Sequence, residues 1–288
     1  MILPDTFTFS QSSLQDFVDC RRRFQLRYLQ RAAWPALQAE PALEAERFAQ
    51  QGAAFHRLVQ QLLTGLPAER LEPLAAQAGL GEWWQSFTQT APHFAGIADP
   101  ASLRLYPEIT LTASFGNHRL AGNHRLLAKY DLLRLSPDGK LTIFDWKTSR
   151  QRTQRKWLAS RLQTRLYPYL LVRAGAYLNG GNPLTPEQVE MVYWFAVDPH
   201  NPEIFTYSQA QFQDDEEFLT GLVDTIQSLP ETAYFLTPDE RQCRFCVYRS
   251  LCNRGETAGD LADFEAADGE ITPLTLDLDF ENLPEISF

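Results

Sequence analysis

The chain has 288 residues, of which 44% are hydrophobic and 22% are charged. This composition is typical of a globular protein and excludes a wholly disordered, collagen-like or coiled-coil chain. The formal net charge of -10, taken for the whole chain, argues against nucleic-acid binding. No apolar run approaches the roughly 20 residues of a membrane-spanning helix, and the first residues lack the features of a secretory signal, so we expect a cytoplasmic protein that does not enter a membrane.

The negative charge is concentrated at one end of the chain. Residues 255–288 hold ten acids and neither Lys nor Arg, and subtracting these ten from the 36 acids leaves 26 acids against 26 bases in residues 1–254. We therefore expect a neutral domain over residues 1–254 and an acidic, flexible tail over residues 255–288. The tail fits either a solvated appendage or a segment that mimics DNA or binds a partner.

Hydrophobic periodicity predicts helices first and then strands. Residues 12–30 begin with a serine cap and have apolar side chains at helical spacing, and residues 41–64 and 74–87 predict further helices. The period then changes, because residues 103–112, 119–135 and 141–147 form apolar runs separated by turn signals. These runs predict an antiparallel meander of three strands.

The second half of the chain alternates between the two periods. It predicts helical structure over residues 151–177, strands over 188–197 and 204–207, a helix over 209–229 and a Cys-bearing loop over 237–254. This order of elements predicts a mixed α/β domain in which helices flank a central mixed sheet.

The third meander strand ends with Asp145-Trp146-Lys147. Because side chains alternate along a strand, Asp145 and Lys147 share one face, and Asp131 closes the preceding strand. Two carboxylates from adjacent strands suit Mg²⁺ or Mn²⁺, and a lysine beside them can hold an attacking water. Phosphodiester hydrolysis needs these groups together. Taken alone, Asp145 and Lys147 would also fit a surface ion pair.

Other side chains have the chemistry to join this site. Gln163 and Tyr167 are four residues apart on the following predicted helix and share one face. His56 offers an imidazole, a common metal ligand, although a lone helical histidine is more often simply packed or exposed. Glu108 on the first strand is a weaker candidate ligand.

These elements, in this order, resemble the RecB-like branch of the PD-(D/E)XK nuclease superfamily. The stretch LLAKYDLLRLSPDGKLTIFDWKTSR is similar to the central meander of that branch, and QTRLYPY is similar to its helical motif. The resemblance implies a restriction-endonuclease-like core. It also implies that His56, Asp131 and Asp145 bind the catalytic metal with the carbonyl of Trp146, and that Lys147 activates the water.

The same resemblance assigns the helical motif. It implies that Gln163 and Tyr167 contact DNA or orient the site. Two positions depart from the pattern: Ala128 stands where a glycine is common, and Pro168, which cannot donate a helical hydrogen bond, directly follows Tyr167.

The four cysteines indicate a second centre. Cys243, Cys246 and Cys252 have C-x₂-C-x₅-C spacing, and Cys20 lies far upstream. Four thiolates can hold Zn²⁺ or an iron-sulfur cluster. One distant cysteine with a C-terminal triplet resembles the 4Fe-4S site of the AddB nuclease domain and of the CRISPR-associated exonucleases, so we expect a cluster, with zinc as the alternative. Either centre would join the two ends of the domain as a structural staple.

Two clusters of basic residues are candidates for contacts with the phosphate backbone. One follows Cys20, and the other falls in residues 147–173, which contain no acid after Lys147. Charge runs are more often solvated helix faces, but beside a nuclease motif they predict sequence-independent DNA binding. The candidate residues are Arg21, Arg22, Arg23, Arg150, Arg155, Lys156, Arg161 and Arg165.

Together these observations predict a metal-dependent DNA nuclease, and we expect an exonuclease of DNA repair, recombination or defence that works with a separate helicase or other partner. One alternative is a catalytically silent DNA-binding or helicase-partner subunit with the same fold. Another is a zinc-stabilised interaction module.

Overall fold

The structure is a computed structural model that describes residues 3–4, 6–32, 40–96, 103–115, 124–244 and 246–255. Residues 119–123 of the second predicted strand and residues 256–288 of the predicted tail lie outside the described residues. Within the described part, no helix has both the length and the apolar character needed to cross a bilayer.

The first predicted helix is not continuous. The chain begins with β1 (Thr8–Ser10), which the sequence did not predict, and Ser10 caps α1 (Gln11–Asp19) by accepting a hydrogen bond from the Ser13 amide. Cys20 is extended, with φ -160° and ψ 106°, and separates α1 from α2 (Arg21–Phe24) and the π-helix η1 (Gln25–Leu29). This break places Cys20 at a bend between two helices.

The next helices form one side of the domain. The long helix α3 (Glu40–Leu63) confirms the prediction over residues 41–64. The prediction of one or two helices over residues 74–87 is confirmed, because this range covers parts of α4 (Ala68–Gln77) and α5 (Gly81–Phe94), which are separated by a turn at Gly79 with φ 71°.

Within the described residues, six strands form one sheet at the centre of the fold. The predicted meander is confirmed by antiparallel pairing of β2 (Arg104–Ser114) with β3 (Arg125–Leu135), and of β3 with β4 (Leu141–Lys147). The sheet is mixed, because β1 is parallel to β3 and β4 is parallel to β5 (Val189–Phe195). The edge strand β6 (Glu203–Thr206) is antiparallel to β5.

The helical prediction over residues 151–177 also contains a break. Arg161, with φ -72° and ψ 143°, separates α6 (Arg155–Ser160) from α7 (Leu162–Ala174). The short 3₁₀ helices η3 (Gly175–Asn179) and η4 (Pro186–Gln188) follow α7, and α8 (Gln209–Ser228) follows the sheet. The Cys-bearing segment contains α9 (Arg241–Arg244) and η6 (Ser250–Cys252), after η5 (Glu231–Ala233).

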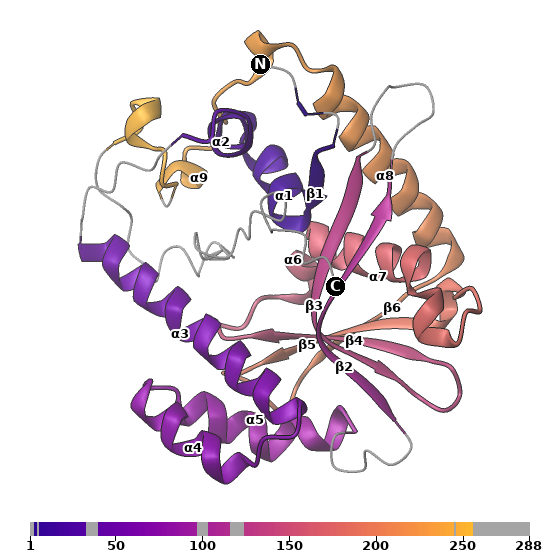
Figure 1. The fold of residues 1–288 in the computed structure, drawn as a ribbon. Coiled ribbons are helices and arrows are strands. Elements are labelled where there is room, and N and C mark those ends of the chain that lie inside the picture. Colours follow the sequence, from indigo (N-terminus) through magenta and orange to yellow (C-terminus); the bar gives the residue numbers. More distant parts are fainter. Residues whose placement is uncertain are drawn as a thin grey trace, which may run out of the picture.

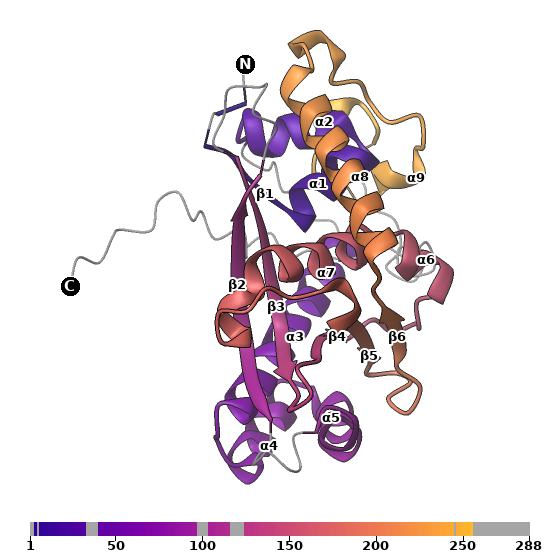
Figure 2. The same cartoon turned by 90° about the vertical axis from the view of Figure 1, so that its right-hand side faces the viewer.

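Helices cover both faces of the sheet, as predicted (Figure 2). One apolar core packs α1, α7 and α8 against one face, and a second core packs α3, α4 and α5 against the other. Adjacent residues of β4 therefore face different cores, because Ile143 belongs to the first and Phe144 to the second. Burial on both faces explains why β4 has apolar side chains on both of them, with Leu141 and Ile143 on one and Phe144 and Trp146 on the other.

The two ends of the domain lie side by side. Figure 1 shows α9, in yellow, beside α2, in indigo. The backbone supports this contact, because the amide of Arg22 donates a hydrogen bond to the carbonyl of Phe235 at 3.2 Å.

Candidate active site and cysteine centre

Three possible metal ligands from three elements meet at the sheet. His56 on α3, Glu108 on β2 and Asp131 on β3 each offer a ligand atom, and these atoms all lie within 4.8 Å of one another. His56 Nδ1 and Asp131 Oδ1 are 3.0 Å apart, and Asp131 Oδ2 accepts a hydrogen bond of 2.8 Å from the Trp146 amide. One imidazole and two carboxylates are a donor set that suits Mg²⁺ or Mn²⁺.

Glu108 occupies a strained position. Its φ is 54°, which is uncommon for a residue that is not glycine and costs on the order of 1–3 kcal/mol. The antiparallel register pairs Pro107 with Leu132 and Ile109 with Tyr130, so Glu108 stands opposite Asp131. Lys129, which the sequence analysis missed, lies 2.5 Å from the Glu108 carboxylate. Lys129 is two residues before Asp131 and therefore lies on the same face of the strand. This spacing in the sequence could have predicted that Lys129 lies near the ligand group.

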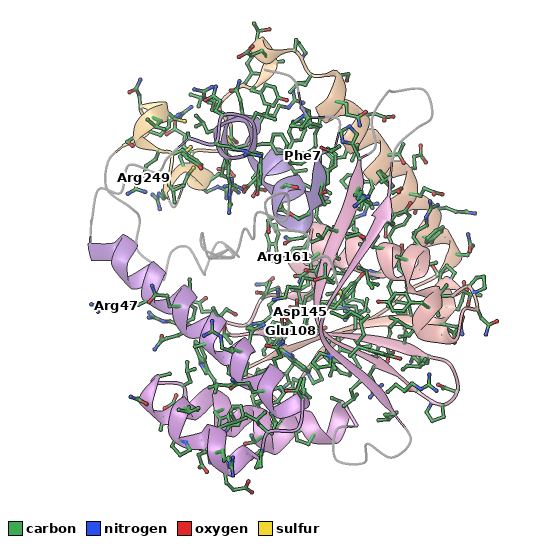
Figure 3. All side chains as sticks on the ribbon, viewed as in Figure 1. Phe7, Arg47, Glu108, Asp145, Arg161 and Arg249 are labelled. Carbon is green, nitrogen blue, oxygen red and sulfur yellow. The ribbon has the colours of Figure 1, made fainter. Side chains whose placement is uncertain are left out.

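A second cluster adjoins the ligand group. Lys147 Nζ lies 2.9 Å from Asp145 Oδ2 and donates a hydrogen bond to Gln163 Oε1 at 2.9 Å, while Gln163 Nε2 donates to Asp145 Oδ1. Asp145 and Gln163 are buried. Figure 3 labels Asp145 and Glu108 close together, where the strands of the sheet cross in this view. These contacts join β4 to α7. Within them, Asp145 contacts both Lys147 and Gln163.

The charges of the ligand group depend on one another. Burial favours the neutral imidazole, but the negative charge and hydrogen bond of Asp131 outweigh it and raise the pKa of His56 to about 9. Burial likewise opposes the charge of Asp131, but His56, the Trp146 amide and Lys147 lower the pKa of that carboxyl. Burial and the neighbouring Asp131 raise the pKa of Glu108.

The helical motif has an ordered position. Helix α7 runs through Pro168 without a break. Tyr130 donates a hydrogen bond of 2.9 Å to the Tyr167 carbonyl, and the two rings have centroids 5.0 Å apart. Tyr167 is 9% exposed, so most of its ring is packed against the core. Its contact with DNA stays a prediction.

The four cysteines surround one pocket. Cys20, Cys243, Cys246 and Cys252 line it together with Arg23, which is held by Asp16 and Asp19 at 2.7 Å each. The thiols are free, and burial together with neighbouring thiols raises the pKa values of Cys243, Cys246 and Cys252. These donors fit a centre that binds four thiolates, and they come from both ends of the domain.

Several predicted phosphate contacts form ion pairs within the protein. Arg155 bonds to Glu203 at 2.8 Å, Arg165 pairs with Asp215, and Arg23 is held by Asp16 and Asp19 as above.

Other candidates contact aromatic rings: Arg21 lies over Phe17, Arg150 over Phe48 and Lys156 over Trp157. Arg22 donates to Gln25 Oε1 at 2.5 Å, and Arg161 joins α6 to α7. DNA binding by each of these residues stays a prediction.

Comparison with known proteins identifies the family. Residues 8–253 match the sequence model of the PD-(D/E)XK nuclease superfamily, and the chain belongs to that superfamily. The mixed sheet flanked by helices is consistent with its restriction-endonuclease-like fold. The match spans the ligand group, the Asp145-x-Lys147 motif and the four cysteines.

Two solved structures are similar to this chain at low identity. SSO0001 is 12% identical, with 87% of each chain covered and a TM-score of 0.41. An exonuclease candidate from Eubacterium rectale is 12% identical, with 77% of this chain and 80% of that chain covered and a TM-score of 0.45. A search of curated proteins gives no match.

Proposed function

We propose that the chain is a metal-dependent deoxyribonuclease that hydrolyses phosphodiester bonds. The observation that carries the proposal is the junction of two clusters on the sheet, where Glu108 and Asp131 lie within β2 and β3 and Asp145 lies near the end of β4. Three ligand atoms of His56, Glu108 and Asp131 lie within 4.8 Å of one another, and Lys147 and Gln163 hold Asp145 beside them. Membership of a nuclease superfamily supports hydrolysis of nucleic acid.

Each residue has a role that its chemistry allows. His56, Asp131 and Asp145 would hold Mg²⁺ or Mn²⁺, with Glu108 as a further ligand and the Trp146 carbonyl assisting. The bound ion would polarise the phosphate and lower the pKa of a water. Lys147 would orient that water and stabilise developing negative charge, because its ammonium lies beside Asp145. Gln163 fixes Lys147 and Asp145 relative to each other through its two hydrogen bonds.

We further propose that the protein belongs to the RecB-like branch and acts as an exonuclease. The support is the ordered set of motifs from His56 to Tyr167, together with the cysteine pocket. This assignment implies a place in DNA repair, recombination or defence, beside a helicase or another partner. A catalytically silent DNA-binding subunit is the alternative, and the retained Asp145 and Lys147 argue against it.

Hydrolysis of labelled DNA tests the activity. Purified protein with Mn²⁺ or Mg²⁺ should degrade end-labelled linear DNA, and Asp145→Asn and Lys147→Ala should each lose that activity. Lys140→Ala is a matched control, because Lys140 lies on the same hairpin, pairs with Glu190 at 2.6 Å and is half exposed. DNA binding without metal-dependent cleavage in the parent would favour the silent subunit. Cleavage of covalently closed single-stranded circles would contradict an exonuclease.

We also propose that the four cysteines hold a 4Fe-4S cluster. The support is their shared pocket, which gathers one thiol from the N-terminal segment and three from the C-terminal segment. The cluster would be a structural link between these segments, because it closes almost the whole length of the domain into one loop. Protein purified without oxygen should absorb near 400 nm, and Cys246→Ser should lose this band. A colourless protein with stoichiometric zinc would support the zinc alternative.

A further inference from the structure

We propose that helix α6 presents Trp157 as a stacking platform for an unpaired base of a DNA strand bound at the active site. The inference rests on the proposed nuclease function and specifies its substrate as a strand with accessible, unstacked bases. Trp157 is 48% exposed, whereas its neighbour Leu158 is fully buried. The buried leucine anchors the helix and the tryptophan projects from it, so a large aromatic surface remains in contact with water.

The platform is held rigidly relative to the catalytic residues. Thr164, on the first turn of α7, donates a hydrogen bond of 2.5 Å to the Leu158 carbonyl and lies 2.7 Å from the Tyr193 hydroxyl. Gln163, which contacts both Asp145 and Lys147, is the residue before Thr164. One short junction therefore ties the turn of α6 that carries Trp157 and Leu158 to the turn of α7 that carries Gln163.

The sheet register places α6 close to the site. Asp145 on β4 pairs with Tyr193 on β5, and Tyr193 pairs with Glu203 on β6, so the three residues form one row across the sheet. Neighbouring strands are about 4.8 Å apart, which puts Glu203 about 10 Å from Asp145. Arg155, the first residue of α6, bonds to Glu203 at 2.8 Å and to the Ile204 carbonyl at 2.9 Å. The guanidinium of the first residue of α6 therefore lies against β6, the strand two spacings away from Asp145.

The charges around the platform favour a polyanion. Lys156 Nζ lies 5.4 Å from the Trp157 ring centroid. The segment from residue 148 to residue 173 contains no acid, and Glu203, which reaches α6 from β6, pairs with Arg155. An ammonium beside an exposed indole offers a phosphate contact and a base-sized apolar face together. Proteins that bind single strands combine these two features.

The ring chemistry distinguishes a single strand from a duplex. In a duplex, neighbouring base pairs cover the faces of each base, whereas an unpaired base exposes its face to an indole. Stacking of this kind is insensitive to sequence, because every base has a π-face. This agrees with the sequence-independent binding expected of the protein.

Binding measurements test the platform directly. The change in fluorescence anisotropy of a labelled 15-nucleotide oligothymidylate should be measured in EDTA at fixed salt, where metal-dependent cleavage cannot occur. Trp157→Ala should raise Kd by about 5- to 100-fold, as expected for the loss of one stacked base. Trp157→Phe should retain most of the affinity, whereas Trp157→Leu should not. Tyr177→Ala is the matched control, because Tyr177 is 60% exposed on η3, beyond the opposite end of α7.

Two further ligands separate stacking from other roles. An abasic strand of the same length should bind Trp157→Ala and the parent with the same Kd. The increase in Kd caused by Trp157→Ala should be much smaller for a blunt duplex than for the oligothymidylate. Equal weakening with the abasic strand would overturn the proposal, and so would a larger loss with RNA than with DNA. Unchanged affinity of Trp157→Ala, in a parent that degrades DNA, would overturn this inference and leave the nuclease function intact. A parent that neither binds nor cleaves DNA would overturn both.

Discussion

Lys147 on β4 donates a hydrogen bond of 2.9 Å to the side-chain oxygen of Gln163 on α7. The amide nitrogen of the same glutamine donates to Asp145. One neutral side chain thus contacts both charged ends of the Asp145-x-Lys147 motif, and it can do so because an amide offers both an acceptor and a donor. Gln163 is buried, so solvent does not compete strongly for these bonds.

Gln163→Ala should therefore lower kcat for DNA hydrolysis by about 10- to 100-fold while KM changes little. The reason is positional, because displacement of a reacting group by about 1 Å can cost on the order of 100-fold in rate. Gln163→Glu keeps the length but brings a carboxylate against Asp145, and it should also lose activity. Full activity in both variants would contradict the positioning role, and thermal unfolding would check that both variants fold.

Glu108→Gln should weaken Mn²⁺ binding by about 10-fold or more, because it removes one charged oxygen ligand from the group formed with His56 and Asp131. Calorimetric titration with Mn²⁺ gives the affinity directly. Lys129→Ala is the informative companion variant, since Lys129 pairs with Glu108 at 2.5 Å and competes with the metal for it. Lys129→Ala should bind Mn²⁺ at least as tightly as the parent. Unchanged affinity in Glu108→Gln would exclude Glu108 as a ligand.

The metal-free protein should lose a stabilising contribution as pH rises from about 6.5 to about 9. Asp131, Asp145 and Glu108 face His56, and the pKa of His56 is raised from 6.5 to about 9 in the folded state. A raised folded-state pKa means that folding favours the protonated ring, so the contribution is complete below the unfolded pKa and disappears above the folded one. In EDTA, His56→Gln should cost more free energy of unfolding at pH 6 than at pH 9.5, as measured by urea denaturation. An equal cost at the two pH values would contradict this.

Gly52→Ala should reduce activity although alanine favours helices. Gly52 lies one turn before His56 on α3, and a Cβ built there would be 3.1 Å from Thr148 Oγ1, directly after Lys147. Either the Thr148 side chain or the helix would have to give by a few tenths of an ångström. Gly221→Ala is the control, because Gly221 lies in α8 with no atom near its added Cβ, and it should gain about 0.5–1 kcal/mol of unfolding free energy.

Gly52→Ala should gain less stability than Gly221→Ala and should lower Mn²⁺-dependent hydrolysis. Adding Thr148→Ala, which removes the contacting oxygen, should restore part of the activity. If Gly52→Ala matched Gly221→Ala in stability and the parent in activity, the close approach of α3 to Thr148 would have no role in placing His56.

Local sequence patterns predicted the elements whose character depends on near neighbours. The apolar run over residues 141–147 and the helical spacing over residues 41–64 predicted β4 and α3 with nearly the bounds that the structure shows. The breaks at Cys20 and Arg161 were not predictable in this way, because each is a single residue with extended dihedral angles inside a helical pattern. Packing and side-chain contacts from distant elements override local propensity at such positions.

The sequence by itself determined that the chain carries the residues of a nuclease motif, equal numbers of acids and bases over residues 1–254, and four cysteines, since these are properties of composition and order. Only the tertiary structure decided which charges meet. The run over residues 148–173 has no acid of its own, yet Glu203 and Asp215 from β6 and α8 pair with three of its arginines, Arg152, Arg155 and Arg165. The antiparallel register likewise set Glu108 opposite Asp131. Pairing between distant segments depends on strand register and helix packing, which local periodicity does not specify.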